Sequence, residues 1–337
     1  MARALGLIAV VATAACGGEP AACTDSATWR IDLTQGAPVA LAVASDGSLY
    51  VALGDSGAGV QLGSYSLFGG HLAHISHEGE LLSVVPAHEG DGHLGPAALL
   101  LDREDNLYVA WRDDYRTTLA RYSPHLELRW SADFAGLGRE VVFDVAASGD
   151  SAVVTHDPQD RRRLYMVDPA GNVRWSMPVE PYGITRVVFG DGGYIYGWVP
   201  GTDGALRYDI EATSSFILGN AAFNNVPTLL RRDGGYIAQT FDMLLRADGR
   251  GNEAWYRAFT GPIVGIPIAS TTGDVLLPAQ SGEGARYVLL IDQDTGATRA
   301  VQSRCASTML GAGDHDSYYG IGGGGDDPGS ISRFPLR

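Results

Sequence analysis

LYVAL at residues 49–53 recurs, 58 residues further along the chain, as LYVAW at residues 107–111. A turn rich in Asp or Gly precedes each run, SDGS before the first and REDN before the second. Five related runs, each after a similar turn, follow as AVVT (152–155), YIYGW (194–198), YIAQT (236–240), VLLPA (275–279) and YYGI (318–321). From the second run onward, the distance from one start to the next lies between 39 and 45 residues. The chain therefore repeats a unit of about 40 residues.

Each unit carries further strand signals. Another apolar strand follows each run, as LAHIS (72–76) follows the first, and after one more turn comes an outer strand such as LLSVV (81–85). Units of about 40 residues made of short strands are typical of the four-stranded antiparallel blade of a β-propeller. No stretch shows the 3.6-residue apolar period of a helix. The sequence therefore predicts an all-β fold.

The seventh unit has no outer strand before Arg337. TWRID at residues 28–32 has the pattern of the outer strands LRWSA (128–132) and VRWSM (173–177). We expect this N-terminal strand to complete the last blade, because a half-built blade would leave an unpaired edge. The prediction is a single seven-bladed β-propeller over residues 28–337, with four-stranded antiparallel blades.

Two turn-and-strand segments carry a resemblance to a known repeat. VDPAGNVRW (167–175) and IDQDTGAT (291–298) resemble the Trp-bearing units of PQQ-like and WD40-like repeat propellers. The resemblance covers essentially residues 28–337 and implies the fold. Some propellers of this kind are enzymes, such as lactonases and quinoprotein dehydrogenases. A quinone-binding site is therefore the first functional site that the resemblance implies.

The first 27 residues read as an export and anchoring segment. Arg3 and the apolar residues 4–15 have the pattern of a signal peptide over residues 1–15. Thr13-Ala14-Ala15-Cys16 resembles a bacterial lipobox, which implies acylation of Cys16, with residues 16–27 as a linker. Thr13 departs from the usual Leu, so cleavage after Ala14 or Ala15 without lipid stays open. We expect an exported lipoprotein of the outer membrane, periplasmic or surface-exposed.

Cys23 and Cys305 remain if Cys16 is lipidated. They are candidates for a disulfide, because export places the chain in an oxidising compartment. The alternative is two unpaired thiols. An outer strand of roughly 17–20 Å separates the two ends at which these cysteines are expected, and a disulfide needs Cα atoms within about 7 Å.

The charge of the chain excludes several classes of protein. The formal net charge is −15, and all 24 basic residues are Arg. An acidic chain is poorly suited to bind the phosphate backbone of nucleic acid, and the lack of Lys excludes a Schiff-base or phosphate-loop lysine. We therefore expect no nucleic-acid partner, and contact with a membrane only through the lipid anchor.

The loops between the second and third strands of each blade vary in length and lie on one face of the predicted ring. Binding residues concentrate in such loops, and Trp, Tyr and Arg are common at binding hot spots. The candidate binding residues on this face are Trp111, Arg112, Asp113, Tyr115, His156, Arg162 and Trp198. The plainer interpretation is a solvated rim of loops.

A weaker candidate is a metal site in the stretch PAHEGDGHLGPA (86–97). His88, Asp91 and His93 share this loop, and imidazole and carboxylate groups are zinc ligands. The alternative is that these are surface residues, and we expect no cofactor.

The sequence thus predicts a non-enzymatic lipoprotein of the cell envelope, whose propeller binds a protein, peptide or glycan on the face with variable loops. The alternative is a propeller enzyme or a metal- or quinone-dependent protein, similar to lactonases or quinoproteins. A surface protein with a structural role alone is the third possibility.

Overall fold

The computed structural model describes most of residues 28–335. The residues of this range outside the description are 36, 55–59, 63–64, 68–69, 87–94, 113–115, 136–140, 160, 180–183, 185, 191–193, 199–204, 210–214, 219–226, 231–235, 240–241, 249–252, 260, 262, 264–266, 270–273, 281–285, 304–308, 312–316 and 325–326. All regular structure in the described part is β-strand. The prediction of an all-β chain is confirmed.

The described strands form seven antiparallel sheets. Sheet 1 contains β2 (Ala37–Val43), β3 (Leu49–Gly54), β6 (His71–Ile75) and β7 (Leu81–Pro86). Sheet 2 contains β8 (Gly95–Leu101), β9 (Leu107–Arg112), β10 (Arg116–Tyr122) and β11 (Leu128–Ala135). Sheet 3 contains β12 (Val142–Val145), β13 (Ser151–His156), β14 (Arg162–Val167) and β15 (Val173–Pro178). Sheet 4 contains β16 (Arg186–Gly190), β17 (Tyr194–Trp198), β18 (Ala205–Asp209) and β19 (Ser215–Leu218).

The remaining sheets continue this pattern. Sheet 5 contains β20 (Pro227–Leu230), β21 (Tyr236–Gln239), β22 (Met243–Ala247) and β23 (Glu253–Ala258). Sheet 6 contains β24 (Ile268–Ala269), β25 (Val275–Gln280), β26 (Arg286–Ile291) and β27 (Thr298–Ser303). Sheet 7 has six strands, in the order β28 (Met309–Gly311), β29 (Ser317–Gly324), β30 (Asp327–Pro335), β1 (Trp29–Gln35), β4 (Val60–Leu62) and β5 (Tyr65–Leu67).

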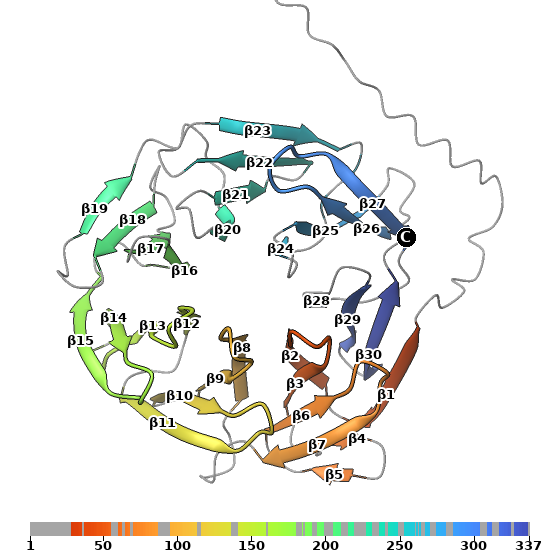
Figure 1. Cartoon of the computed structure of the whole chain (residues 1–337), viewed down its shortest axis with the longest axis horizontal. Coiled ribbons are helices and arrows are strands. Elements are labelled where there is room, and N and C mark those ends of the chain that lie inside the picture. The colour runs from red at the N-terminus through yellow and green to blue at the C-terminus, as the bar shows by residue number, and fades with distance from the viewer. Residues whose placement is uncertain are drawn as a thin grey trace, which may run out of the picture.

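The sheets follow one another in chain order around a ring (Figure 1). In sheets 1 to 6 the first strand lies toward the centre of the ring and later strands lie progressively outward, whereas in sheet 7 the innermost strand is β28 and β1 lies outside β30 (Figure 1). The predicted four-strand unit is confirmed in sheets 1 to 6.

The N-terminal strand β1 pairs with β30, the last strand of the chain. Trp29 lies opposite Arg333, and Ile31 lies opposite Ile331. The other end of β1 pairs with β4, with Leu33 opposite Leu62. Between β3 and β6 in the chain lies the β4–β5 hairpin, which extends sheet 7 beyond β1.

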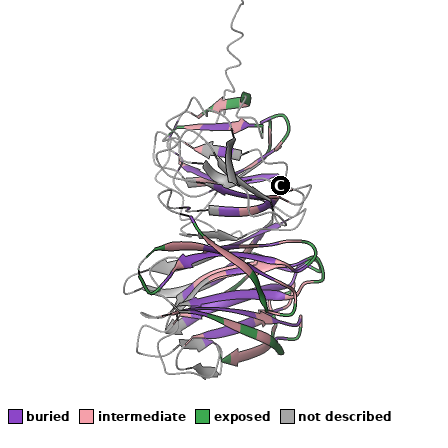
Figure 2. Ribbon diagram, turned by 90° about the vertical axis from the view of Figure 1, so that its left-hand side faces the viewer, coloured by how far each residue is buried: buried purple, intermediate pink, exposed green. Residues whose placement is uncertain are grey.

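The core lies between neighbouring sheets. Second strands such as β3, β13 and β25 are buried at five of their six residues, which explains why the repeated runs are continuously apolar and do not alternate. Outer strands such as β23 are partly exposed (Figure 2). Leu33, Leu49 and Tyr319 belong to one apolar cluster, so sheet 7 packs against sheet 1.

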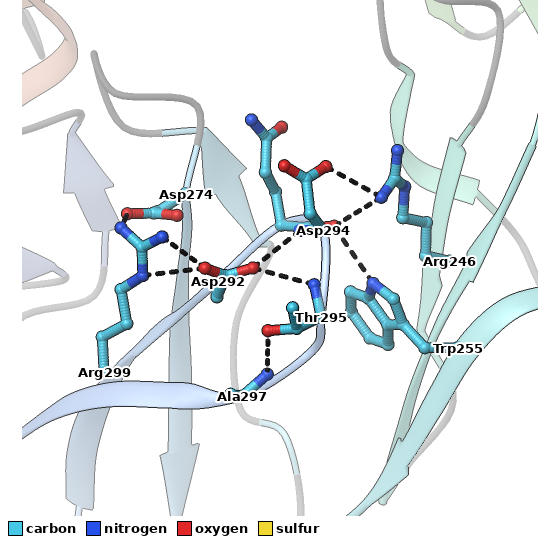
Figure 3. Close-up of polar contacts among 9 residues, drawn as sticks. Arg246, Trp255, Asp274, Asp292, Asp294, Thr295, Ala297 and Arg299 are labelled. Atoms are coloured by element: carbon cyan, nitrogen blue, oxygen red, sulfur yellow. Dashed lines mark hydrogen bonds and ion pairs between the residues drawn. The ribbon is translucent and has the colours of Figure 1, made fainter.

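Tryptophans on outer strands join one sheet to a turn of the next. Trp130 in β11 donates from Nε1 to the carbonyl oxygen of Pro169 at 2.8 Å. Trp29 donates in the same way to His77 at 2.8 Å, and Trp255 donates to Gln293 at 3.0 Å (Figure 3). These contacts join sheet 7 to sheet 1, sheet 2 to sheet 3, and sheet 5 to sheet 6.

Polar side chains hold the turns that these tryptophans contact: Ser76 in the first turn, Asp168 in the second and Asp292 in the third. In the turn after β26, Asp292 Oδ1 accepts from the backbone N–H groups of Asp294 at 2.9 Å and Thr295 at 2.8 Å (Figure 3). Arg299 bridges Asp292 and the buried Asp274. The Thr295 N–H first, and then the Arg299 guanidinium, hold the pKa of Asp292 well below its usual range.

No helix in the described part of the chain is long and apolar enough to cross a bilayer.

Candidate functional site

The structure brings several predicted binding residues to one end of three neighbouring sheets. Arg112, His156 and Trp198 are the last residues of β9, β13 and β17, the second strands of sheets 2, 3 and 4. Their backbones therefore reach the predicted face with variable loops. The side chains of Arg112 and Trp198 lie outside the described part of the structure, as do residues Asp113 and Tyr115.

Trp111 corrects one part of the predicted binding surface. Its side chain is 0% exposed and belongs to the apolar cluster between sheets 1 and 2, together with Tyr50 and Val109. Successive side chains of a strand point to opposite faces, so Trp111 shares the face of Val109 and turns toward sheet 1. A side chain in this position cannot contact a partner at the surface.

A tight hairpin places His156 opposite Arg162. These residues end β13 and begin β14, and they form the last pair of the ladder. Between them, Asp157 Oδ1 accepts from the backbone N–H groups of Gln159 at 2.9 Å and Arg161 at 3.0 Å. The Asp157 N–H donates to the Arg161 carbonyl oxygen at 2.8 Å and closes the turn. These hydrogen bonds fix the turn that joins β13 to β14.

Burial opposes the ionisation of Asp157, but hydrogen bonds from Arg161 and Gln159 outweigh it and hold the pKa of this carboxyl below its usual range. Arg161 also forms an ion pair with Asp157 at 2.9 Å. The carboxylate is thus engaged within its own turn.

Beside this hairpin lies a small, shallow depression that is open to solvent. It lies at the boundary between sheets 3 and 4. The lining combines an apolar floor with a polar rim, formed by Val142, Val154, Thr155, His156, Arg162 and Ile184. None of these six residues is acidic.

Gly197 in sheet 4 shapes one wall of the depression. A Cβ at this position would lie 2.8 Å from Ile184 Cδ1, so the glycine leaves the space that Ile184 occupies. Ile184 is 1% exposed and packs with Val154 in the cluster between sheets 3 and 4.

The polar rim is held by specific hydrogen bonds. Arg162 donates from Nε to His156 Nε2 at 3.4 Å and from Nη1 to the Ile184 carbonyl oxygen at 3.2 Å. Thr155 turns the other way and shares a hydrogen bond of 2.9 Å with Thr117 of sheet 2. His156 Nδ1 is buried and has no hydrogen-bond partner among the described residues.

No group of three or more metal-binding side chains occurs in the described part of the chain. The predicted metal ligands His88, Asp91 and His93 lie outside it, and so do Cys16, Cys23 and Cys305.

Sequence reasoning missed Thr155, Ile184 and Gly197 as parts of the site. The hairpin itself left a signal, because Asp157-Pro158 repeats the Asp168-Pro169 that opens the turn after β14. No motif marks Ile184, because its position depends on packing between two sheets.

The fold is that of a repeat β-propeller. No family model matches the chain, and no curated protein matches its sequence. A solved structure of a streptogramin B lyase is similar with a TM-score of 0.63 at 9% identity, over 92% of this chain and 97% of that one.

Two structures of virginiamycin B lyase from Staphylococcus aureus are similar as well. One is a catalytically inactive variant with quinupristin, with a TM-score of 0.62 at 10% identity over 90% of this chain and 98% of that one. The other is substituted with selenomethionine and has a TM-score of 0.56 at 11% identity, with coverage of 90% and 98%. At these identities the likeness concerns the fold alone.

Proposed function

We propose that this chain is a closed seven-bladed β-propeller that is exported, anchored through Cys16, and used as a non-enzymatic binding module of the cell envelope. Its partner is a protein, peptide or glycan. Each of the seven sheets corresponds to one blade, and β1 completes the last.

Contacts between sheet 7 and sheet 1 support a closed ring. Tyr319 of sheet 7 donates to the Gly47 carbonyl oxygen of sheet 1 at 2.6 Å, as Tyr108 of sheet 2 donates to Gly149 of sheet 3 at 3.0 Å. Trp29 adds its hydrogen bond to His77. The first and last sheets are thus joined by the same kinds of contact as sheets 2 and 3.

The observation that carries the binding role is the depression at the end of sheets 3 and 4. It has an apolar floor, a polar rim and a buried His156 Nδ1 with no partner among the described residues. A concave site with a few convergent polar groups is the usual form of a ligand site.

An affinity capture tests this proposal. Soluble residues 24–337 serve as bait for detergent-solubilised envelope of the source organism. The site variant carries His156→Ala and Arg162→Ala. The matched control carries His125→Ala and Arg129→Ala, the same residue types in the turn before β11 and in β11 itself. We expect wild type and control to retain a partner that the site variant loses. No partner on any bait, or equal capture by all three, would overturn the proposal.

The anchor is tested separately by labelling with radioactive palmitate. We expect label on the wild-type chain and none on Cys16→Ser. An unlabelled wild-type chain would support cleavage after Ala14 or Ala15 without lipid.

A propeller lyase is the second candidate, because the similar solved structures are enzymes and the depression contains a histidine. Mass spectrometry of quinupristin incubated with the purified chain tests it. Conversion that is lost in His156→Ala would favour the lyase, and an unchanged mass leaves the binding module as the better assignment.

A further inference from the structure

We propose that the junction between sheets 1 and 2 is a pH-sensitive contact, in which protonation of His74 loosens the turn end, where Tyr50 and Leu126 join the two sheets. The turn end is the end that carries the turns at residues 44–48 and 123–127, opposite the face with variable loops. This response is a property of the fold and is independent of the binding role proposed above.

The junction between sheets 1 and 2 is built without the tryptophan contact described above for other sheets. The outer strand of sheet 1, β7, contains no tryptophan. Instead, Tyr50 in β3 donates from its hydroxyl to the Pro124 carbonyl oxygen at 2.8 Å, in the turn before the outer strand of sheet 2. The Tyr50 side chain is buried. A hydrogen bond from a tyrosine therefore takes the place of the indole contact.

Two turn residues of sheet 2 are held in an unfavourable backbone conformation at this junction. Among the residues that the structure describes, Asp105 and Leu126 are the two non-glycine residues with positive φ, at +58° and +60°. The position equivalent to Leu126 in sheet 3 is Gly171. Bulky residues rarely adopt this conformation, and it persists only where surrounding contacts hold it. Contacts with sheet 1 do so here, because the Ser45 N–H donates to Asp105 at 3.0 Å and Leu126 is buried in one apolar cluster with Tyr50.

His74 of β6 lies within this strained part of the junction. Its ring stacks on the ring of Tyr50, with the centroids 4.3 Å apart and the planes 16° from parallel. His74 Nε2 and Ser48 Oγ form a hydrogen bond of 2.9 Å, and the Ser48 side chain is buried. The histidine therefore contacts both the tyrosine that joins the two sheets and the turn that precedes β3.

The surroundings of His74 favour its neutral form. Burial lowers the pKa of His74 most, Asp46 of the same sheet acts against burial, His125 of sheet 2 adds to it, and the net shift is downward. The hydroxyl of Ser48 holds the pKa of Asp46 below its usual range, so this carboxylate stays ionised in mild acid. Ser83, opposite His74 in β7, carries no charge. Protonation thus places a charge where burial disfavours it, and opening of the turn end relieves the cost by giving His74 access to water.

The direction and the range of the response follow from this shift. In the open form His74 has its ordinary pKa of about 6.5, whereas the packed form holds the pKa lower. The open form therefore binds more protons, and the free energy that keeps the turn end closed falls as the pH drops below about 6.5. Trp111 lies near the opposite end of β9, so a local opening at the turn end leaves its packing in place.

Amide hydrogen exchange of the folded protein, followed by NMR, tests the inference. The Leu126 N–H donates to the Ser123 carbonyl oxygen at 2.9 Å, and the equivalent Gly171 N–H in sheet 3 donates to Asp168 at 2.9 Å, which makes Gly171 the internal reference. Protection factors at pH 7 and about pH 5.5 remove the intrinsic pH dependence of exchange. We expect protection of Leu126 to fall by about twofold to tenfold at the lower pH, the upper limit being set by a histidine pKa of about 6.5 in the open form. Protection of Gly171 should not change.

Variants assign the response to one side chain. In His74→Gln the protection of Leu126 should be the same at both pH values, because glutamine does not titrate. His74→Phe keeps an aromatic ring beside Tyr50 and serves as a second neutral variant. His125→Gln is the matched control and should keep most of the response, because His125 is exposed. Unchanged protection of Leu126 in wild type, an equal loss at Gly171, or a loss that persists in both neutral variants would overturn the inference.

Discussion

Gly171 lies directly under a tryptophan ring of the preceding sheet. Its φ is +89°, and a Cβ would lie 2.8 Å from Trp130 Cδ2. Gly79 and Gly296 have positive φ and the same relation to Trp29 and Trp255. The glycine allows both the turn and the close approach of the ring, which explains the recurring Gly in these turns.

Gly171→Ala should destabilise the fold more than Gly149→Ala does. Both positions have positive φ, so each alanine costs about 1–2 kcal/mol in backbone strain. A Cβ at Gly149 has its nearest contact at 3.1 Å, to the Tyr108 hydroxyl, whereas at Gly171 it overlaps the Trp130 ring. Overpacking of this kind costs about 1–3 kcal/mol more. Urea unfolding of the two variants measures the difference, and equal losses would contradict the ring contact.

Asp292 makes stability depend on pH in a definite direction. Its folded pKa lies below the unfolded value of about 4, so its contribution is complete above about pH 4 and is lost as the pH falls further. Asp292→Asn should therefore reduce the free energy of unfolding at pH 7, and the reduction should shrink toward pH 3. The exposed Glu78 supplies a control in Glu78→Gln. A penalty at Asp292 that does not change with pH would argue against this role.

The hairpin of β13 and β14 is the element that carries the candidate site. The turn from Asp157 to Arg161 has the same backbone hydrogen bond and the same accepting carboxylate as the turn from Asp168 to Asn172. One presents His156 and Arg162 to the depression, and the other forms a contact with Trp130. The same turn thus serves binding in one place and packing in the other.

Asp157→Ala and Asp168→Ala separate these two roles. Both should lower Tm, because each leaves two backbone N–H groups of a turn without their acceptor. Only Asp157→Ala should also weaken capture of the envelope partner, because the turn holds His156 opposite Arg162. Thermal unfolding and the affinity capture measure the two effects, and weakened capture by Asp168→Ala would show that the hairpin does not act locally.

The sequence predicted the strands well because each repeat buries the same positions. LYVAL and LYVAW are both second strands, and their apolar runs reflect burial on both sides. Trp111 was misjudged because a residue near the end of β9 was assigned to the exposed face, whereas its side chain is buried between sheets 1 and 2. His156 and Arg162 were predicted individually, but Ile184 comes to them only through packing between sheets, which no local pattern records.

At the scale of the whole molecule, sheet 7 unites the two ends of the chain. β1 supplies Leu33, which is 1% exposed, and the indole of Trp29 that bonds to sheet 1. β1 also covers the edge of β30, which would otherwise be free to pair with another chain.

Removal of β1 should therefore abolish cooperative folding. A chain that begins at residue 37 loses the β30 pairing, the Trp29 hydrogen bond and a buried leucine, and losses of this kind are comparable to the total stability of about 5–15 kcal/mol. A chain that begins at residue 28 should fold. Urea unfolding and light scattering compare the two, and a cooperative, monomeric transition in the shorter chain would show that β1 is dispensable.

The contacts that join the two ends of the chain also determine when sheet 7 can form. Tyr319 and its acceptor Gly47 are 272 residues apart, and contacts of such separation form late and slowly. A ribosome makes β1 first and β30 last, so sheet 7 cannot assemble before synthesis is almost finished. Until then β1 lacks its partner β30, and a partly folded chain with an unpaired strand edge is prone to aggregate. If the chain is exported, as we propose, the same delay keeps it unfolded while it is threaded through an export channel, and sheet 7 forms only on the far side.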